Sequence, residues 1–335
     1  MTAFSLGLNF EREIREQPGV WRRLAASGNA QRLAAALDGP VVLVGSGSSL
    51  FAGELGALAL RRRRIEAHAL AATEARLDHR IYEGRIVVAI SQSGRSADLL
   101  EALDILKPSR LVALTNTANS PLADRAHLAI DVGAGPEKAV PASKSVSSTV
   151  AHLLWAASII GNDDSRKPDV LIRTADAIET WLDGPEVGKL VNAAGAIAQR
   201  HSVVILGSDY GLPVAREASL KLKEASYLHA EGFAAGEFRH GSVAMVDASA
   251  SVVGIVDEDA LPVVARPMEE LKTSGALRFS IGAPNLDGVP RLGPTVEEPY
   301  NTLAWLVTVQ LIALHAARAR GIESDAPRGL TKSLK

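Results

Sequence analysis

Short apolar runs, largely β-branched, alternate with longer amphipathic segments along this sequence of 335 residues. The runs show no polar alternation, which is typical of strands buried on both faces of a parallel sheet. Strands are expected at 41–44, 65–70, 86–90, 111–114, 127–132, 203–206, 252–256 and 277–281. Helices are expected at 10–37, 50–62, 98–103, 143–160, 210–229 and 300–318. This alternation predicts an α/β fold in which parallel sheets carry helices on both faces.

The pattern repeats within the chain. VLVGSGSSLFAGELGALAL at 42–60 resembles VILGSDYGLPVAREASLKL at 204–222, an offset of 162 residues (207 − 45). A duplicated domain explains this self-similarity. We expect an N-terminal helix plus first domain at 1–165, a second domain at 166–320, and a tail at 321–335 that closes over the site.

The most informative stretch is IVVAISQSGRSADL at 86–99, where a buried strand gives way to a hydroxyl-rich turn and then a helix. The first turn of a helix presents free N–H groups and a positive dipole end, which suit an anion. The sequence lacks the lysine of a P-loop and a G-x-G-x-x-G motif, which favours a sugar phosphate over a nucleotide. The candidate ligands are Ser91, Gln92, Ser93 and Ser96. The alternative is that Ser91 and Ser96 only cap the helix.

A second strand–turn–helix unit precedes this one and carries Ser48 and Ser49 in its turn. Ligands of parallel sheets bind at the carboxyl ends of strands. Because both turns follow predicted strands, we expect both at that edge of the sheet.

Composition narrows the possible functions. The net charge is −2 and charge is not concentrated in blocks, which argues against nucleic acid as a partner. The basic run Arg61–Arg64 is expected to complement the end of a helix. Absence of cysteine excludes disulfides, thiolate metal sites and a cysteine nucleophile. No secretory signal or membrane-spanning stretch is apparent, so we expect a cytoplasmic protein with no membrane partner.

Four motifs in order carry a family resemblance: AISQSGRSADLL, EKAVPASKS, ASLKLKEASYLHAEGFAAGEFRHGSVA and DAPRGLTKS. With them the chain resembles double sugar-isomerase (SIS) domain proteins. It is similar to the isomerase half of glutamine–fructose-6-phosphate aminotransferase, also called glucosamine-6-phosphate synthase. The resemblance covers nearly the whole chain. It implies two tandem flavodoxin-like SIS subdomains, no metal and no nucleotide cofactor.

The resemblance also implies roles for individual residues. The phosphate ligands would be Ser48, Ser91, Gln92, Ser93 and Ser96, with Ser49 against the sugar. The remaining candidates are Lys221 and Glu224 from the KLKE segment, Glu217 four residues before Lys221, His240 from RHG, and Lys332 from the tail. In the family a glutamate moves a proton between sugar C1 and C2, the histidine opens the pyranose ring, and the tail lysine can form a Schiff base with a ketose phosphate.

Each of these residues also has an ordinary structural interpretation. Glu217, Lys221 and Glu224 have the spacing of ion pairs on a solvated helix face. His240 can be a core histidine, and Lys332 a charge on a free tail. Lys144 can reach the sugar or close a loop, and the sequence does not decide between these roles.

The pattern is most similar to stand-alone SIS-type glucosamine-6-phosphate deaminases. Without a cysteine the chain cannot release ammonia from glutamine as the synthase does. We therefore expect it to convert glucosamine 6-phosphate to fructose 6-phosphate and ammonia. The alternatives are an aminotransferase- or deglycase-type enzyme on a related amino-sugar phosphate, and a non-catalytic phosphosugar sensor.

The segment AEGFAAGEF is rich in small residues and has two phenylalanines, so it can pack closely against a twin surface. The resemblance implies that His240 reaches the site of a neighbouring subunit. We therefore expect a homodimer with sites completed across an isologous interface. The alternative is that the segment folds back and serves its own subunit.

Overall fold

The computed structural model describes residues 5–332, which form two units named here after their sheets. The first-sheet unit contains residues 16–137, 144–175 and 331–332, and the second-sheet unit contains residues 5–15, 138–143 and 176–330. The chain passes from the first-sheet unit to the second-sheet unit between Ala175 and Asp176, whereas the sequence predicted a boundary between residues 165 and 166. The N-terminal residues 5–15 also group with the second-sheet unit, because α1 (Leu8–Arg15) packs against α14 (Asn301–Ala319).

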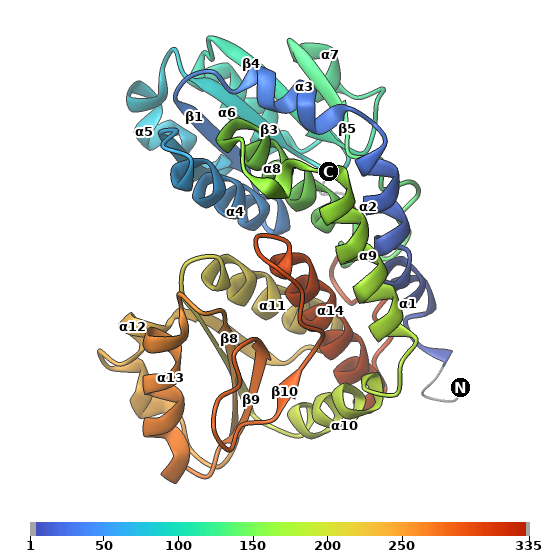
Figure 1. Ribbon diagram of the computed structural model, residues 1–335, viewed down its shortest axis with the longest axis vertical. Coiled ribbons are helices and arrows are strands. Elements are labelled where there is room, and N and C mark those ends of the chain that lie inside the picture. The colour runs from blue at the N-terminus through green and yellow to red at the C-terminus, as the bar shows by residue number, and fades with distance from the viewer. Residues whose placement is uncertain (1–4, 333–335) are drawn as a thin grey trace. The chain divides into compact units, whose positions relative to one another are not determined.

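The first sheet has five parallel strands in the order β2-β1-β3-β4-β5. They are β1 (Val41–Gly45), β2 (Ala67–Ala71), β3 (Ile86–Ile90), β4 (Arg110–Thr115) and β5 (Leu128–Asp131). Strands β1, β3, β4 and β5 are labelled in Figure 1. β1 and β3 are buried along their full length, as their continuous apolar runs predict. The two turns that follow them therefore lie at the same edge of the sheet.

Helices cover both faces of the first sheet. They are α2 (Gln17–Ala25), α3 (Asn29–Ala36), α4 (Ser48–Arg62), α5 (Ala75–Tyr82), α6 (Ala97–Leu106), α7 (Pro121–Arg125) and α8 (Lys144–Gly161), with short 3-10 turns at Ala72–Glu74 and Asp164–Arg166. Val42 and Val44 join a core cluster with residues of α5, α6 and α7. Leu43, which points to the other face, is approached by α4. Gly56 of α4 allows this contact, since a Cβ there would lie 2.8 Å from Leu43 Cδ2.

The second sheet repeats this topology with the order β10-β9-β8-β6-β7, also parallel throughout. Its strands are β6 (Ser202–Gly207), β7 (His229–Ala234), β8 (Ala250–Val256), β9 (Leu277–Gly282) and β10 (Arg291–Leu292). Since β6 takes the place of β1 and β8 that of β3, the duplication read from the sequence is confirmed at the level of topology.

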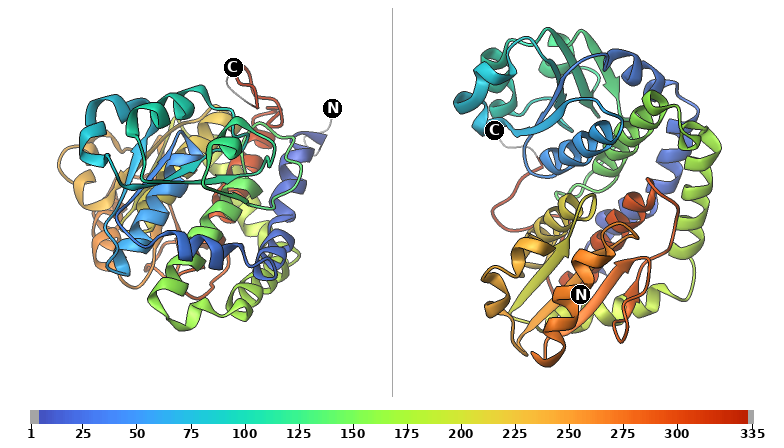
Figure 2. Two further views of the ribbon diagram at one scale, coloured as in Figure 1. Left: turned by 90° about the horizontal axis from the view of Figure 1, so that it is seen from above. Right: turned by 60° about the vertical axis from the view of Figure 1, so that its left-hand side comes forward.

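The helices of the second sheet divide between its two faces. They are α10 (Val187–Ala198), α11 (Gly211–Ser226), α12 (Ala235–Phe238), α13 (Leu261–Glu270) and α14, with 3-10 turns at Ser242–Met245 and Leu271–Thr273. Val203 and Ile205 face α10, α11 and α14, whereas Val204 and Leu206 pack with α12 and α13. Figure 2 shows α11 and α14 side by side, in agreement with their extensive contact. α9 (Pro168–Leu182) continues the chain from one unit into the other.

Helix α14 is long and apolar enough to cross a membrane by length and composition alone. However, 89 % of its most apolar window is buried inside the protein, which is typical of a core helix. Its residues pack against α10 and α11 in the second-sheet unit.

Two expectations about secondary structure were wrong. The single helix expected at 10–37 is three helices, because Pro18 lies in the first turn of a new helix that begins at Gln17 and Gly28 adopts a left-handed conformation with φ 68°. The helix expected to reach His229 ends at Ser226, and His229–Ala234 forms the edge strand β7. The strand was missed because it consists largely of small residues, which give no apolar run. Gly232 has to be small, since a Cβ there would lie 2.6 Å from the backbone of Ala215 in α11.

Candidate active site

The hydroxyl-rich turn after β3 is held by its own serines. Ser91 is buried and its Oγ accepts a hydrogen bond from the Gly94 N–H at 3.1 Å. Ser93 Oγ accepts from the Arg95 N–H at 3.3 Å. A hydroxyl that accepts a bond inside the turn still keeps its O–H to donate. Both serines can therefore shape the turn and also donate to a phosphate oxygen.

Ser96 occupies the N-cap position of α6, yet its side chain makes no capping hydrogen bond. The interpretation of Ser96 as a simple cap therefore does not hold in this structure. Its hydroxyl and the unpaired N–H groups of the first helical turn together form an array of donors suited to an anion.

The turn is also fastened to the neighbouring strand. The Gln92 carbonyl oxygen accepts hydrogen bonds from the Asn116 N–H at 3.1 Å and from the hydroxyls of Thr115 and Thr117 at 3.3 Å each. Gly94 has φ 63°, and a Cβ there would collide with Ser120. This position therefore requires glycine, and the turn has one well-determined backbone path.

Ser48 and Ser49 are half-buried in the first turn of α4, which follows β1. Because β1 pairs directly with β3, the two serine-bearing turns leave adjacent strands at their carboxyl ends. The structure thus places all six predicted phosphate and sugar ligands in one unit, on two neighbouring turns.

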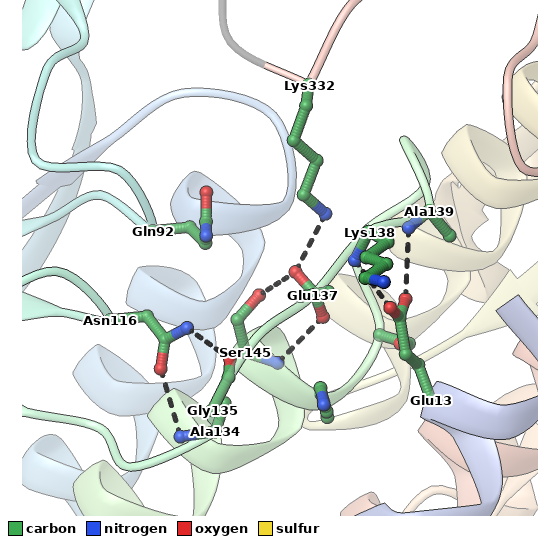
Figure 3. A network of polar contacts seen from close by, with 12 residues as sticks. Glu13, Gln92, Asn116, Ala134, Gly135, Glu137, Lys138, Ala139, Ser145 and Lys332 are labelled. Atoms are coloured by element: carbon green, nitrogen blue, oxygen red, sulfur yellow. Dashed lines mark hydrogen bonds and ion pairs between the residues drawn. The ribbon is translucent and has the colours of Figure 1, made fainter. Parts of the chain in front are cut away.

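Asn116 donates its backbone N–H to the Gln92 carbonyl in the turn after β3, and its side chain bonds to the loop at 133–137 (Figure 3). Its Nδ2 donates to the Gly135 carbonyl at 2.8 Å, and its Oδ1 accepts from the Ala134 N–H at 3.0 Å. Asn116 was not among the predicted site residues. The sequence feature that could have identified it is a single amide side chain directly after a buried strand.

Glu137 lies at the end of this loop, and its side chain is 0 % exposed. It accepts hydrogen bonds from the Ser145 N–H at 3.1 Å, the Ser145 hydroxyl at 2.7 Å and Nζ of Lys332 at 2.9 Å (Figure 3). Burial by itself raises the pKa of the Glu137 carboxyl, but Lys332 and the bonds from Ser145 outweigh it and hold the pKa below its ordinary value. The tail lysine is therefore bound by a buried carboxylate that sequence reasoning missed, although EKAVPASKS was recognised as a motif.

Lys144 forms an ion pair with Glu16, and its side chain is 4 % exposed. This ion pair supports the structural role among the two that the sequence left open. Lys144 fastens the start of α8 to the segment that precedes α2.

In the second-sheet unit, Glu217, Lys221 and Glu224 form a cluster on α11. Lys221 Nζ lies 2.6 Å from Glu224 Oε2 and 3.5 Å from Glu217 Oε1. The side chains of Glu217 and Lys221 are 1 % exposed, whereas that of Glu224 is 21 % exposed. These residues do not form a solvated face, and Glu224 is the member that remains accessible.

His240 follows α12 and is exposed. Within the second-sheet unit, α12 and α13 pack on the face of the sheet that receives Val204 and Leu206, and α11 packs on the opposite face. The sheet therefore lies between the helix that carries Glu224 and the segment that carries His240. Of the predicted residues in this unit, Glu217, Lys221 and Glu224 come together, and His240 does not join them.

Glu13 of α1 supports the segment that follows Glu137. Its buried carboxylate accepts hydrogen bonds from the backbone N–H groups of Lys138 and Ala139, the latter at 3.2 Å. Within residues 5–332, no group of three or more His, Asp and Glu side chains has the arrangement of a metal site.

Two parallel α/β units, one with a serine-rich turn at the carboxyl edge of its sheet, define a tandem doubly wound protein. Residues 39–159 and 196–317 match the model of the SIS domain. The chain belongs to the SIS domain family, and the resemblance inferred from its motifs is confirmed.

Sequence relatives include glutamine–fructose-6-phosphate aminotransferase (isomerizing) from Sulfolobus acidocaldarius, 32 % identical over 89 % of this chain and 50 % of the relative. The enzyme of the same name from Corynebacterium glutamicum is 32 % identical over 98 % of this chain and 58 % of its own length. The chain thus spans about half the length of the curated relatives it matches.

Solved structures of similar fold include the C-terminal domain of glucosamine-fructose-6-phosphate aminotransferase from Francisella tularensis, with a TM-score of 0.82, 22 % identity and coverage of 95 % of this chain and 98 % of that one. Another is glucosamine-6-phosphate deaminase from Thermotoga maritima, with a TM-score of 0.77, 22 % identity and coverage of 97 % and 99 %. These likenesses confirm the tandem SIS fold.

Proposed function

We propose that the protein is a phosphosugar isomerase and deaminase that converts glucosamine 6-phosphate and water to fructose 6-phosphate and ammonia. The observation that carries the proposal is the cluster on α11. An aldose–ketose isomerase needs one base that is fixed in place and reaches both reacting carbons. Glu224 fits this need, since it stands on a rigid helix, is oriented by buried Lys221, and stays accessible.

The proposed reaction balances with these residues. His240 assists opening of the pyranose ring to the aldehyde. Glu224 removes the C2 proton and returns it to C1, and a proton passes from the amino group to O1, which gives the 2-imine of fructose 6-phosphate. Water adds to C2 of this imine and ammonia leaves. The serine-bearing turns bind the phosphate, and the tail amine of Lys332, held by Glu137, must give up a proton before it can add to the ketose carbonyl.

The 335 residues include no cysteine, so by themselves they offer no thiol to attack glutamine. An aminotransferase- or deglycase-type reaction on a related amino-sugar phosphate is the second candidate, and a phosphosugar sensor the third. The buried Glu217–Lys221–Glu224 cluster favours an enzyme, because a sensor has no need of a buried charged group beside an accessible base.

The decisive experiment offers the purified protein a panel of hexosamine 6-phosphates, with and without glutamine, and assays ammonia and ketose phosphate separately. Ammonia and fructose 6-phosphate from glucosamine 6-phosphate alone support the proposal. Amino-sugar synthesis that depends on glutamine favours the second candidate, and binding without turnover favours the sensor. Glu224→Gln should lower turnover on the order of 10²-fold while phosphosugar binding persists. Solvent exchange of the C2 proton at the normal rate in this variant would show that another residue is the base.

We further propose a two-fold homodimer in which His240 serves the site of the partner subunit. Support comes from the second sheet, which lies between α11 and the segment that carries His240. Mixing Glu224→Gln with His240→Ala under conditions that exchange subunits tests this. If His240 acts in trans, each mixed dimer has one intact site and activity returns. If mass spectrometry shows exchange and activity stays absent, His240 acts on its own subunit.

A further inference from the structure

The amino-terminal edge of the second sheet carries two adjoining open pockets of about 390 and 320 Å³. They share Tyr227, Leu228 and His229, at the connection between α11 and β7. Their basic lining residues are Arg200, His201, Lys223, His229, Arg320 and Arg328, and among residues 5–332 no carboxylate lines either pocket. We call these adjoining pockets the basic pocket. None of its residues belongs to the candidate active site.

The positive charge of this pocket is largely uncompensated. Within residues 5–332, no carboxylate lies within ion-pair distance of Arg200, Lys223, Arg320 or Arg328. The two histidines contribute less, since His229 Nε2 lies 3.3 Å from a carboxylate oxygen of Glu231 and His201 lies near Asp247. The four lysine and arginine side chains therefore dominate the local charge.

Helix ends reduce this charge without cancelling it. Three helices, α10, α11 and α14, end at the pocket, and each carboxyl end is equivalent to about half a negative charge. Four full positive charges exceed this contribution. Arg320 Nη1 donates to the Ala198 carbonyl at 3.0 Å and Arg200 Nη1 donates to the Ala248 carbonyl at 2.8 Å. Each guanidinium has five N–H groups, so most of its donors are left for a ligand.

The pocket also has a fixed wall. The Tyr227 hydroxyl accepts a hydrogen bond from the Arg328 N–H at 2.7 Å, and the Arg328 guanidinium lies 4.4 Å from the centroid of the Tyr227 ring. This stacking holds the Arg328 guanidinium in position without the help of an acidic side chain. Planar guanidinium groups from separate segments match the oxygens of a phosphoryl group, which each can bind in bidentate fashion.

We propose that the basic pocket binds a small phosphorylated metabolite, at a site separate from the serine-bearing turns of the first-sheet unit. Tyr227 follows α11 three residues after Glu224, and Arg328 precedes Lys332 by four residues in the tail. The occupant would therefore contact both segments that carry assigned catalytic groups. This position is suited to an effector, and binding there does not depend on the reaction proposed above.

Isothermal titration calorimetry with inorganic pyrophosphate at physiological ionic strength tests the proposal. The double variant Arg200→Gln/Arg320→Gln should bind about tenfold or more weakly than the unmodified protein. The matched double variant Lys189→Gln/Arg266→Gln removes the same charge from exposed, acid-paired positions of the same unit and should bind normally. Ser96→Ala reports on the turn after β3 and should leave the pyrophosphate binding that depends on Arg200 and Arg320 unchanged.

Equal weakening in both double variants would show a general charge effect and overturn the proposal. A loss confined to Ser96→Ala would assign the ligand to the serine-bearing turn, and absence of binding at millimolar pyrophosphate would also overturn it. If Arg200→Gln/Arg320→Gln fails to fold by circular dichroism, Arg328→Gln takes its place, since Arg328 is exposed. Slower amide hydrogen exchange at 321–332 with pyrophosphate is expected in the unmodified protein alone, and unchanged exchange would overturn the effector role.

Discussion

Nζ of Lys332 lies 2.9 Å from Oε2 of Glu137, a carboxylate whose side chain is completely buried. Lys332 stands near the end of the chain, 195 residues after Glu137. The ion pair therefore fixes a tail residue to the loop at 133–137, and Asn116 joins that loop to the turn after β3. In this way one unit brings together the tail amine and the predicted phosphate ligands.

Glu137→Gln keeps the shape of the side chain and removes the charge that holds Lys332. We expect turnover of glucosamine 6-phosphate to fall by roughly tenfold to a hundredfold, because a charge-assisted bond becomes a neutral one. Solvent exchange of the C2 proton, for which Glu224 is the proposed base, should change less than ammonia release. The exposed Glu83→Gln is the matched control. Full turnover in Glu137→Gln would show that the ion pair plays no part in the reaction.

Ser96→Ala separates the two interpretations of that serine. Because Ser96 makes no capping bond, its loss should leave thermal stability nearly unchanged. Loss of a donor to phosphate should weaken fructose 6-phosphate binding by about tenfold or more, measured by calorimetry. Ser120 does cap α7 by accepting from the Ala123 N–H at 3.3 Å, so Ser120→Ala should cost about 1 kcal/mol of stability. A Ser96→Ala protein that loses stability and binds normally would identify Ser96 as a cap.

Gly232→Ala tests the close packing of β7 on α11. A Cβ at Gly232 would lie 2.6 Å from backbone atoms of Ala215, and neither element can yield locally. We expect the free energy of unfolding to fall by about 1–3 kcal/mol in urea titrations. Gly236→Ala is the control, because its nearest neighbour is Val263 Cγ1 at an ordinary 3.8 Å. Equal stability of the two variants would mean that β7 and α11 are farther apart in solution.

His152 predicts a specific pH dependence of stability. It is buried in α8, its Nδ1 donates to the Ser148 carbonyl at 2.8 Å, and burial lowers its pKa from 6.5 to about 4. Between pH 6.5 and 4, His152 therefore takes up a proton in the unfolded chain but stays neutral in the folded protein. Stability from this group is complete above pH 6.5 and is lost as pH falls through this range, by about 3 kcal/mol at most.

The measurement for His152 is thermal unfolding as a function of pH, compared with His152→Leu. The variant should lose less stability than the unmodified protein between pH 6.5 and 4. His315, whose pKa burial also lowers to about 4, remains in both proteins and cancels in the comparison. Parallel pH profiles would show that His152 takes up a proton between pH 6.5 and 4 as readily in the folded protein as in the unfolded chain.

The sequence by itself determined the α/β class, the duplication and the serine-bearing turns. These features are local, because a buried parallel strand is a continuous apolar run and a turn for an anion needs small polar residues directly after it. The same locality explains the errors. The strand at His229–Ala234 consists largely of small residues selected by the proximity of α11, and nothing in its own composition indicates that neighbour.

Only the tertiary structure decided which polar residues are partners. Glu137 and Lys332 are more than 100 residues apart, as are Glu16 and Lys144. The sequence around a carboxylate does not indicate which distant amine it will pair with. The KLKE spacing was equally consistent with a solvated helix face until burial of Glu217 and Lys221 excluded it. Burial and long-range pairing depend on how strands are ordered in a sheet, which the chain specifies through the sum of its packing contacts rather than through any single motif.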